Sequence, residues 1–169
     1  VEITPLELAG LYAGLADGGR SMSPRLLESI SSGPRVRITS PGAAWLTRRA
    51  LSRRDRPDFP GRQRVTGRHS AIHWKTGTSY GHRDAWAAGS GNRYTAVIWL
   101  GNLDFQGAVD LVGAEAAGPL LFDLLEGLGD AVKPAGPSSP TSDLLPVEVC
   151  ALSGCLAKPA CPHRTTALA

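Results

Sequence analysis

The sequence predicts an α+β domain in which an antiparallel sheet packs with helices. Three neighbouring segments, 71–78, 84–89 and 94–100, are rich in the β-branched and aromatic residues that favour strands. They lie between segments whose apolar residues recur at helical spacing, an order typical of α+β domains. The chain of 169 residues is long enough for about one domain with its own core.

The first helix is expected to begin at a capping box. Thr4 is placed as the N-cap, Pro5 takes the first helical position, and Glu7 can bond back to the cap amide. Apolar side chains follow at helical spacing until Gly18–Gly19, which ends the helix. A second helix is expected to begin at Ser40-Pro41.

The remaining elements follow from turn residues and periodicity. Ser90-Gly91-Asn92 has turn chemistry, so the second and third strand segments are expected to form a hairpin. Residues 20–40 and 52–70 read as loops, because they lack a sustained apolar pattern. A third helix is expected over 112–128. Its apolar stripe would comprise Ala116, Leu120, Leu121, Leu124 and Leu125.

Composition excludes several classes of protein. With 42% hydrophobic and 20% charged residues, the chain is not a disordered tail, and no apolar run approaches the roughly 20 residues of a membrane helix. No targeting signal is recognisable in it. Eight arginines lie between Arg48 and Arg68, but Phe59 is the only aromatic residue among them. Nucleic acid is therefore not an expected partner, and a solvated loop explains the arginines better.

The segment with the clearest chemistry is Lys75-Thr76-Gly77-Thr78 on the first strand. Gly77 would let a ligand backbone approach the strand closely. Lys75 offers a positive charge to a substrate carboxylate, and the Thr76 hydroxyl can hydrogen-bond the same group. The amide of Thr78 can donate into an oxyanion hole if the strand borders a cleft. Taken alone, three residues are a weak signal, and an ordinary edge strand is the alternative interpretation.

Taken together, these segments resemble the transpeptidase domain of class A penicillin-binding proteins. The resemblance rests on HWKTGTS at 73–79, on SYGHRDAW at 79–86, and on the hairpin that ends WLGN at 99–102. The helix start at 1–9 and the helix at 112–122, which resembles the family's closing helix, occur in the order of the same family, so the likeness covers nearly the whole chain. Beyond them, VCALSG at 149–154 and Cys161-Pro162 resemble the start of the small C-terminal domain of the 1C subgroup.

The resemblance implies a serine D,D-transpeptidase that cross-links peptidoglycan stem peptides through an acyl-enzyme and is acylated by β-lactams. It implies that Lys75, Thr76, Gly77 and Thr78 bind the substrate, with Lys75 and Thr76 at its terminal carboxylate. The amide of Thr78 would contribute to the oxyanion hole. The parent protein would act at the periplasmic face of the bacterial inner membrane, with its anchor, and any glycosyltransferase domain, upstream. No cofactor or metal is expected.

The family's nucleophile is missing from this sequence. The family has Ser-x-x-Lys, then Ser-x-Asn, then Lys-Thr-Gly, and no serine here is followed three residues later by lysine. Ser90-Gly91-Asn92 matches the second motif as a string, but it follows Lys-Thr-Gly and reads as a turn. We therefore expect the C-terminal part of a transpeptidase domain, truncated on its N-terminal side and inactive alone, whose partner is the upstream half of that domain. The alternative is a degenerate copy that only binds peptidoglycan or penicillin.

The chain is expected to divide into three parts. Residues 1–128 would belong to the transpeptidase domain, 129–146 to a linker rich in proline and serine, and 147–169 to the start of a small β domain.

The three cysteines all lie in the last of these parts. A Cys150–Cys161 disulfide that leaves Cys155 free is expected in an oxidising compartment. The alternative is a zinc site of the three cysteines with His163. Its spacings differ from the usual zinc knuckle, and Pro162 separates the last two ligands.

Other candidate residues surround the motif. His73 and His82 flank it, and each is a candidate base. Since neither has an identifiable serine to activate, a structural or solvated role is the better interpretation. Trp74, Trp86 and Trp99 lie on successive strands and are expected to pack across the strands, with stacking on substrate as the alternative.

Overall fold

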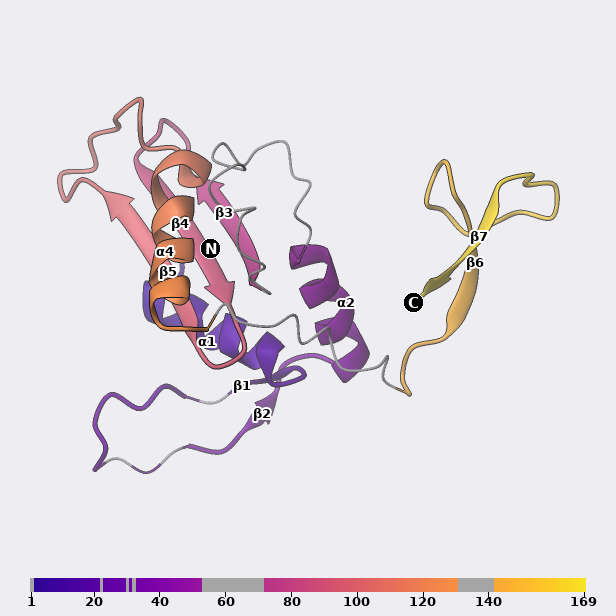
Figure 1. Cartoon of the computed structure of the whole chain (residues 1–169), viewed down its shortest axis with the longest axis horizontal. Coiled ribbons are helices and arrows are strands. Elements are labelled where there is room, and N and C mark those ends of the chain that lie inside the picture. Colours follow the sequence, from indigo (N-terminus) through magenta and orange to yellow (C-terminus); the bar gives the residue numbers. More distant parts are fainter. Residues whose placement is uncertain (1, 22, 30, 32, 53–71, 131–141) are drawn as a thin grey trace.

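The computed structural model describes residues 2–21, 23–29, 31, 33–52, 72–130 and 142–169. Its elements alternate between helices and short antiparallel sheets, as Figure 1 shows. In chain order they are α1 (Pro5–Ala16), β1 (Arg20–Ser21), β2 (Val36–Arg37), α2 (Pro41–Leu51), β3 (His73–Thr78), β4 (Asp84–Ser90), β5 (Thr95–Gly101), the π-helical turn η1 (Gly113–Ala117), α4 (Gly118–Gly127), β6 (Pro146–Cys150) and β7 (Arg164–Leu168).

The three predicted strands form one antiparallel sheet in the order β3-β4-β5. The predicted hairpin between β4 and β5 is confirmed, since Ser90 pairs with Thr95 and the Gly91 amide donates to the Tyr94 carbonyl at 2.9 Å. Asp130 holds this turn from a distant part of the chain. Its carboxylate accepts the amides of Arg93 at 2.7 Å and Tyr94 at 2.9 Å while it is almost fully buried.

The main core lies between this sheet and α4, which covers one sheet face in Figure 1. Trp74 of β3 meets Phe122 of α4 edge to face, with 5.5 Å between ring centroids. Leu121 and Leu125 are fully buried against the same face. Because side chains alternate along a strand, the core takes every second residue of each strand. These residues are Trp74 and Thr76 of β3, Ala85 and Ala87 of β4, and Ala96, Ile98 and Leu100 of β5.

Both predicted helix starts are confirmed. Thr4 and Glu7 form the capping box, with the Glu7 carboxylate accepting the Thr4 amide at 2.8 Å. The Ser40 hydroxyl accepts the Ala43 amide at 3.1 Å and caps α2. Helix α1 contacts β4 and β5, and Thr95 lines a pocket along α1. Since Thr95 lies on the sheet face opposite to Ala96, α1 covers the face that α4 leaves open.

The third predicted helix differs from the expectation in two ways. It begins with a π-helical turn, in which the Gly118 amide reaches the Gly113 carbonyl, and Pro119 near the start of α4 has no amide to continue an α-helical ladder. The buried stripe is also displaced, because Leu120 and Leu124 are 45% and 44% exposed. The residues that face the core are Ala117, Leu121, Phe122 and Leu125.

Two expected loops have different outcomes. The segment 20–40 contains a short ladder, in which Arg20 pairs with Arg37 and Ser21 with Val36. Residues 53–70 of the expected arginine-rich loop lie outside the described residues, as does residue 71 of the first expected strand. Strands β6 and β7 form a two-stranded sheet of their own, which Figure 1 shows apart from the larger sheet, on the far side of α2. Among the helices that the structure describes, none has the length and apolar character to cross a membrane.

Candidate active-site edge

The Lys-Thr-Gly-Thr motif lies on β3, at an edge of the sheet. The ladder between β3 and β4 continues beyond the strand ends, because the Ser79 amide donates to the Asp84 carbonyl at 3.0 Å. Hydrogen-bonded pairs alternate in an antiparallel ladder, so Gly77 and Lys75 bond to β4 while the backbone groups of Thr76 and Thr78 point the other way. No strand in the described ranges pairs with that free edge.

The side chains of the motif divide between the two faces of the sheet. Lys75 and Gly77 are exposed on one face, whereas Thr76 is buried on the face that η1 and α4 cover. The Lys75 ammonium donates to the Thr76 carbonyl, which points to the free edge. Among the described residues, a Cβ at Gly77 would contact only the Trp86 Cβ, at 3.9 Å, so this part of the chain leaves the surface above Gly77 open. A positive charge and an open backbone therefore share this edge.

Thr78 is fixed by a residue that sequence reasoning missed. Its hydroxyl accepts the Gly113 amide at 2.8 Å, at the start of η1. A Cβ at Gly113 would come within 2.1 Å of the Gly77 carbonyl oxygen, so only glycine allows η1 to lie this close to β3. Nothing local in the sequence marks Gly113, because its partner is 35 residues away.

His73 is a packing residue in this structure. Its Nδ1 lies 2.9 Å from the Arg48 carbonyl and its Nε2 lies 3.1 Å from a guanidinium nitrogen of Arg48. Because guanidinium only donates, Nε2 accepts and Nδ1 carries the proton. Burial, and then the charge of Arg48, hold the pKa of His73 below its usual range. Both ring nitrogens therefore join α2 to β3, which fits the structural interpretation of this histidine.

His82 has no comparable burial. It is exposed in the turn between β3 and β4, in the left-handed region at φ 53°. Its carbonyl accepts the Ala108 amide at 3.0 Å, and the carbonyl of the neighbouring Gly81 contacts Gly107 so closely that a Cβ there would come within 2.1 Å. The turn after the motif is thus held by the loop that follows β5.

The three tryptophans follow the expectation in part. Trp86 and Trp99 are cross-strand neighbours, with 6.4 Å between ring centroids, and Trp99 Nε1 donates to Asp84 at 2.9 Å. Trp74 does not join them, because the alternation of side chains sends it to the opposite face, where it packs on Phe122.

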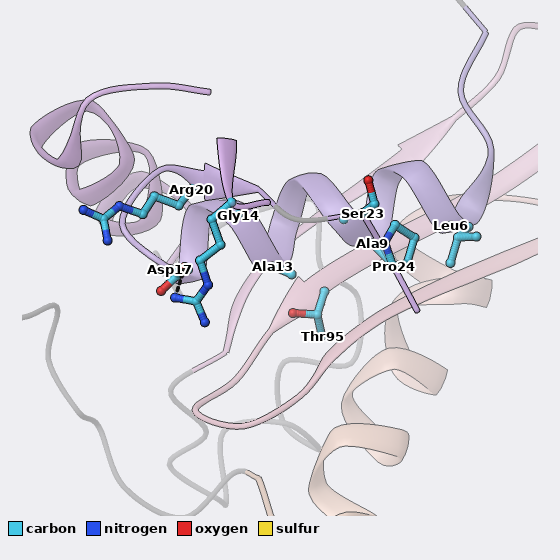
Figure 2. A pocket seen from close by; sticks show the side chains of 11 residues that line it. Leu6, Ala9, Ala13, Gly14, Asp17, Arg20, Ser23, Pro24 and Thr95 are labelled. Atoms are coloured by element: carbon cyan, nitrogen blue, oxygen red, sulfur yellow. Dashed lines mark hydrogen bonds and ion pairs between the residues drawn. The ribbon is translucent and has the colours of Figure 1, made fainter. Parts of the chain in front are cut away.

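A surface hollow along α1 is a different feature. Figure 2 shows this pocket between α1 and the segment after β1, with Leu6 and Pro24 at one end. At the other end, Arg35 forms a 3.1 Å ion pair with Asp17. None of the four motif residues lines it. The pocket is therefore separate from the motif.

Comparison with known proteins identifies the family. Residues 1–100 match the model of the penicillin-binding protein transpeptidase domain. The chain belongs to the penicillin-binding protein transpeptidase family. It is 37% identical over 115 residues to penicillin-binding protein 1C of Escherichia coli K12, and 33% identical over 132 residues to penicillin-binding protein 1B of Vibrio cholerae O1. Each alignment covers 68% of this chain.

A solved structure supports the same fold. The crystal structure of penicillin-binding protein 1A from Haemophilus influenzae matches 97% of this chain with a TM-score of 0.70 at 20% identity. The chain spans 14% and 16% of the two curated relatives and 32% of the solved structure. It therefore corresponds to a limited part of these penicillin-binding proteins, and the predicted α+β transpeptidase fold is confirmed.

Proposed function

We propose that this chain forms part of a serine D,D-transpeptidase, a periplasmic enzyme anchored in the bacterial inner membrane that cross-links peptidoglycan stem peptides. The observation that carries the proposal is the position of the Lys-Thr-Gly-Thr motif at the free edge of β3, in a chain of the transpeptidase family. An extended stem peptide, or a β-lactam that mimics it, would lie along this edge as an added strand.

The charge at the edge supports a substrate that ends in a carboxylate. Lys75 is the cation of the motif, and the next lysine along the chain is Lys133. The ammonium of Lys75 would leave the Thr76 carbonyl and bond the carboxylate of the stem peptide or β-lactam. Gly77 leaves room for the peptide backbone, since the Trp86 Cβ is the one atom that the described part of the chain places near its missing side chain.

Thr78 would stabilise the transition state. Its amide belongs to the set that points away from β4, so it is available to a carbonyl oxygen placed at the edge. As the nucleophile adds, that oxygen gains negative charge and the amide bond to it strengthens. The hydroxyl bond from Gly113 would keep this backbone in place during the reaction.

The nucleophile would come from the segment that precedes Val1. No serine in the chain has a lysine three residues later, so the acyl-enzyme would form on a serine of the upstream half of the domain. That serine would displace the terminal D-Ala, and an amine of a second stem peptide would then attack the ester. A glycosyltransferase domain would lie further upstream.

The test compares the 169-residue chain with the longer protein that contains it. We expect intact-mass spectrometry to find a penicillin adduct on the longer protein only, at a serine before Val1. The longer protein should also release D-Ala from a pentapeptide substrate. An adduct on the isolated chain would refute the claim that the nucleophile lies outside these 169 residues. Binding without any acylation or D-Ala release would instead support the degenerate binding module.

A further inference from the structure

The three cysteines gather at one end of the β6–β7 hairpin. Cys150 ends β6, and its carbonyl accepts the Gly154 amide at 2.8 Å, which turns the chain sharply. The Cys150 amide in turn donates to the Cys155 carbonyl at 2.8 Å. Cys150, Cys155 and Cys161 line one surface pocket together with Ser153 and Lys158. The fold therefore places three thiols around a shared hollow that solvent and small molecules can enter.

The surroundings of the Cys150 sulfur favour its thiolate. Ser153, through its hydroxyl and its amide, and Leu152, through its amide, favour this thiolate, and the neighbouring Cys161 thiol adds to their effect. These groups lower the pKa of Cys150 to about 7. The backbone of His163 acts to lower the pKa of Cys161. The interaction of Cys161 with Cys150 and the charge of Cys150 outweigh that effect, so the pKa of Cys161 is raised. The two neighbouring thiols thus differ in character, one a ready thiolate and the other a proton donor.

Burial contributes little to this hairpin. Every residue of 142–169 is exposed or only partly buried, and its salt bridge, Arg164–Glu148 at 3.2 Å, lies at the surface. A surface ion pair contributes about 0–1 kcal/mol, so among the described residues neither burial nor charge adds much to the stability of the hairpin. A covalent link is the usual means by which such a small unit becomes stable.

We propose that Cys150 and Cys161 form a reversible disulfide pair in which Cys150 attacks first and Cys161 resolves. With a low-molecular-weight disulfide as oxidant, the Cys150 thiolate attacks one of its sulfurs and expels the other half as a thiolate. Cys161 then loses its proton and attacks the Cys150 sulfur, which expels the second half and closes the link. Two thiols are oxidised, one small disulfide is reduced to two thiols, and Cys155 stays free.

This pair is independent of the proposed transpeptidase activity, and a metal centre competes poorly with it. Among the described residues, no group of three His, Cys, Asp or Glu side chains is arranged to hold a metal ion. The sequence-based alternative, a zinc site of three cysteines and His163, therefore lacks support in the geometry.

The first experiment traps the intermediate in the full 169-residue chain carrying Cys155→Ser. Oxidised glutathione is added, free thiols are alkylated, and intact mass is measured. We expect the background variant to lose both thiols to an internal disulfide. Adding Cys161→Ser should make glutathione accumulate on Cys150, whereas adding Cys150→Ser should leave Cys161 largely unmodified. Equal glutathione on both single thiols, a pairing that involves Cys155 in the unmodified chain, or one bound zinc per chain would overturn the proposal.

The second experiment measures alkylation by iodoacetamide against pH in single-thiol variants. With Cys150 as the single thiol, alkylation should reach half of its maximal rate near pH 7. At neutral pH Cys150 should react on the order of fivefold faster than Cys161 as the single thiol. The factor stays modest because a thiolate of low pKa is less nucleophilic, which offsets part of the gain from its larger thiolate fraction. Ser153→Ala should move the Cys150 profile to higher pH, because it removes the hydroxyl that favours the thiolate. Identical profiles for Cys150 and Cys161 would contradict the assigned order of attack.

Discussion

The three-stranded sheet and the β6–β7 hairpin are both antiparallel, yet they are stabilised by different means. The sheet is covered by α1, η1 and α4, and fully buried residues such as Leu121 and Leu125 fill the space beneath it. The hairpin has no buried residue in 142–169 and carries its three cysteines instead. The comparison teaches that burial fixes the motif strand β3, whereas the hairpin is held by its ladder and other local bonds.

The largest expected effect breaks the core of the first region. Leu125→Ala removes a fully buried side chain and should lower the free energy of unfolding by about 2–5 kcal/mol, because it leaves a cavity. Leu156→Ala in the hairpin, where the side chain is 72% exposed, should change it by less than about 0.5 kcal/mol. Urea unfolding followed by circular dichroism measures both. Equal losses would show that the two regions are not stabilised differently.

A smaller effect is expected where η1 meets β3. Gly113→Ala would place a Cβ 2.1 Å from the Gly77 carbonyl oxygen, and should cost about 1–3 kcal/mol as the two backbones move apart. Gly127→Ala is the matched control, because no atom of the described residues lies within 4 Å of its Cβ and alanine favours a helix. Thermal unfolding should move in opposite directions for the two variants. A neutral Gly113→Ala would refute the close approach.

The difference between these two glycines also shows what the sequence can reveal. Patterns of adjacent residues were sufficient to predict the capping box at Thr4, the turn after Ser90, and the strand that holds Lys75. They were insufficient for Gly113 and Asp130, whose partners lie 35 to 37 residues away. Such contacts depend on the assembled fold, so no local pattern marks them.

The same limit explains the errors in α4. The spacing of apolar residues predicted the helix correctly but not its buried face. The π-helical turn at 113–117 changes which side of the helix the following residues occupy. Leu120 and Leu124 fit an apolar stripe as well as Leu121 and Leu125 do, and only the fold decides between them. In the motif, the residue types alone predicted a site for a carboxylate substrate. The direction of the Thr78 amide could be inferred only once the register of β3 with β4 was known.

The smallest expected effect on stability is a pH dependence at the junction of α2 and β3. The folded pKa of His73 lies below its ordinary value, so the unfolded chain binds a proton first as the pH falls. The contribution of His73 is therefore fully present above about pH 6.5 and is lost as the pH falls towards the folded pKa.

Urea unfolding between about pH 5 and pH 8 tests this dependence. His73→Asn should make the free energy of unfolding depend less on pH in this range. His82→Asn, a change at the exposed histidine, is the control and should leave the pH dependence as in the unmodified chain. A profile that is the same with and without His73 would contradict the buried, neutral imidazole.

The central claim is that Lys75 at the free edge of β3 anchors the substrate carboxylate, and the second-order rate of β-lactam acylation tests it most directly. In the longer protein, Lys75→Ala should lose about one to two decades in this rate, since a charge-assisted bond contributes roughly 1.5–3 kcal/mol. Lys75→Arg should recover part of the loss, and His82→Ala should cost less than about 1 kcal/mol. Thermal unfolding controls for misfolding. A Lys75→Ala variant that folds normally and acylates at the unmodified rate would contradict the claim.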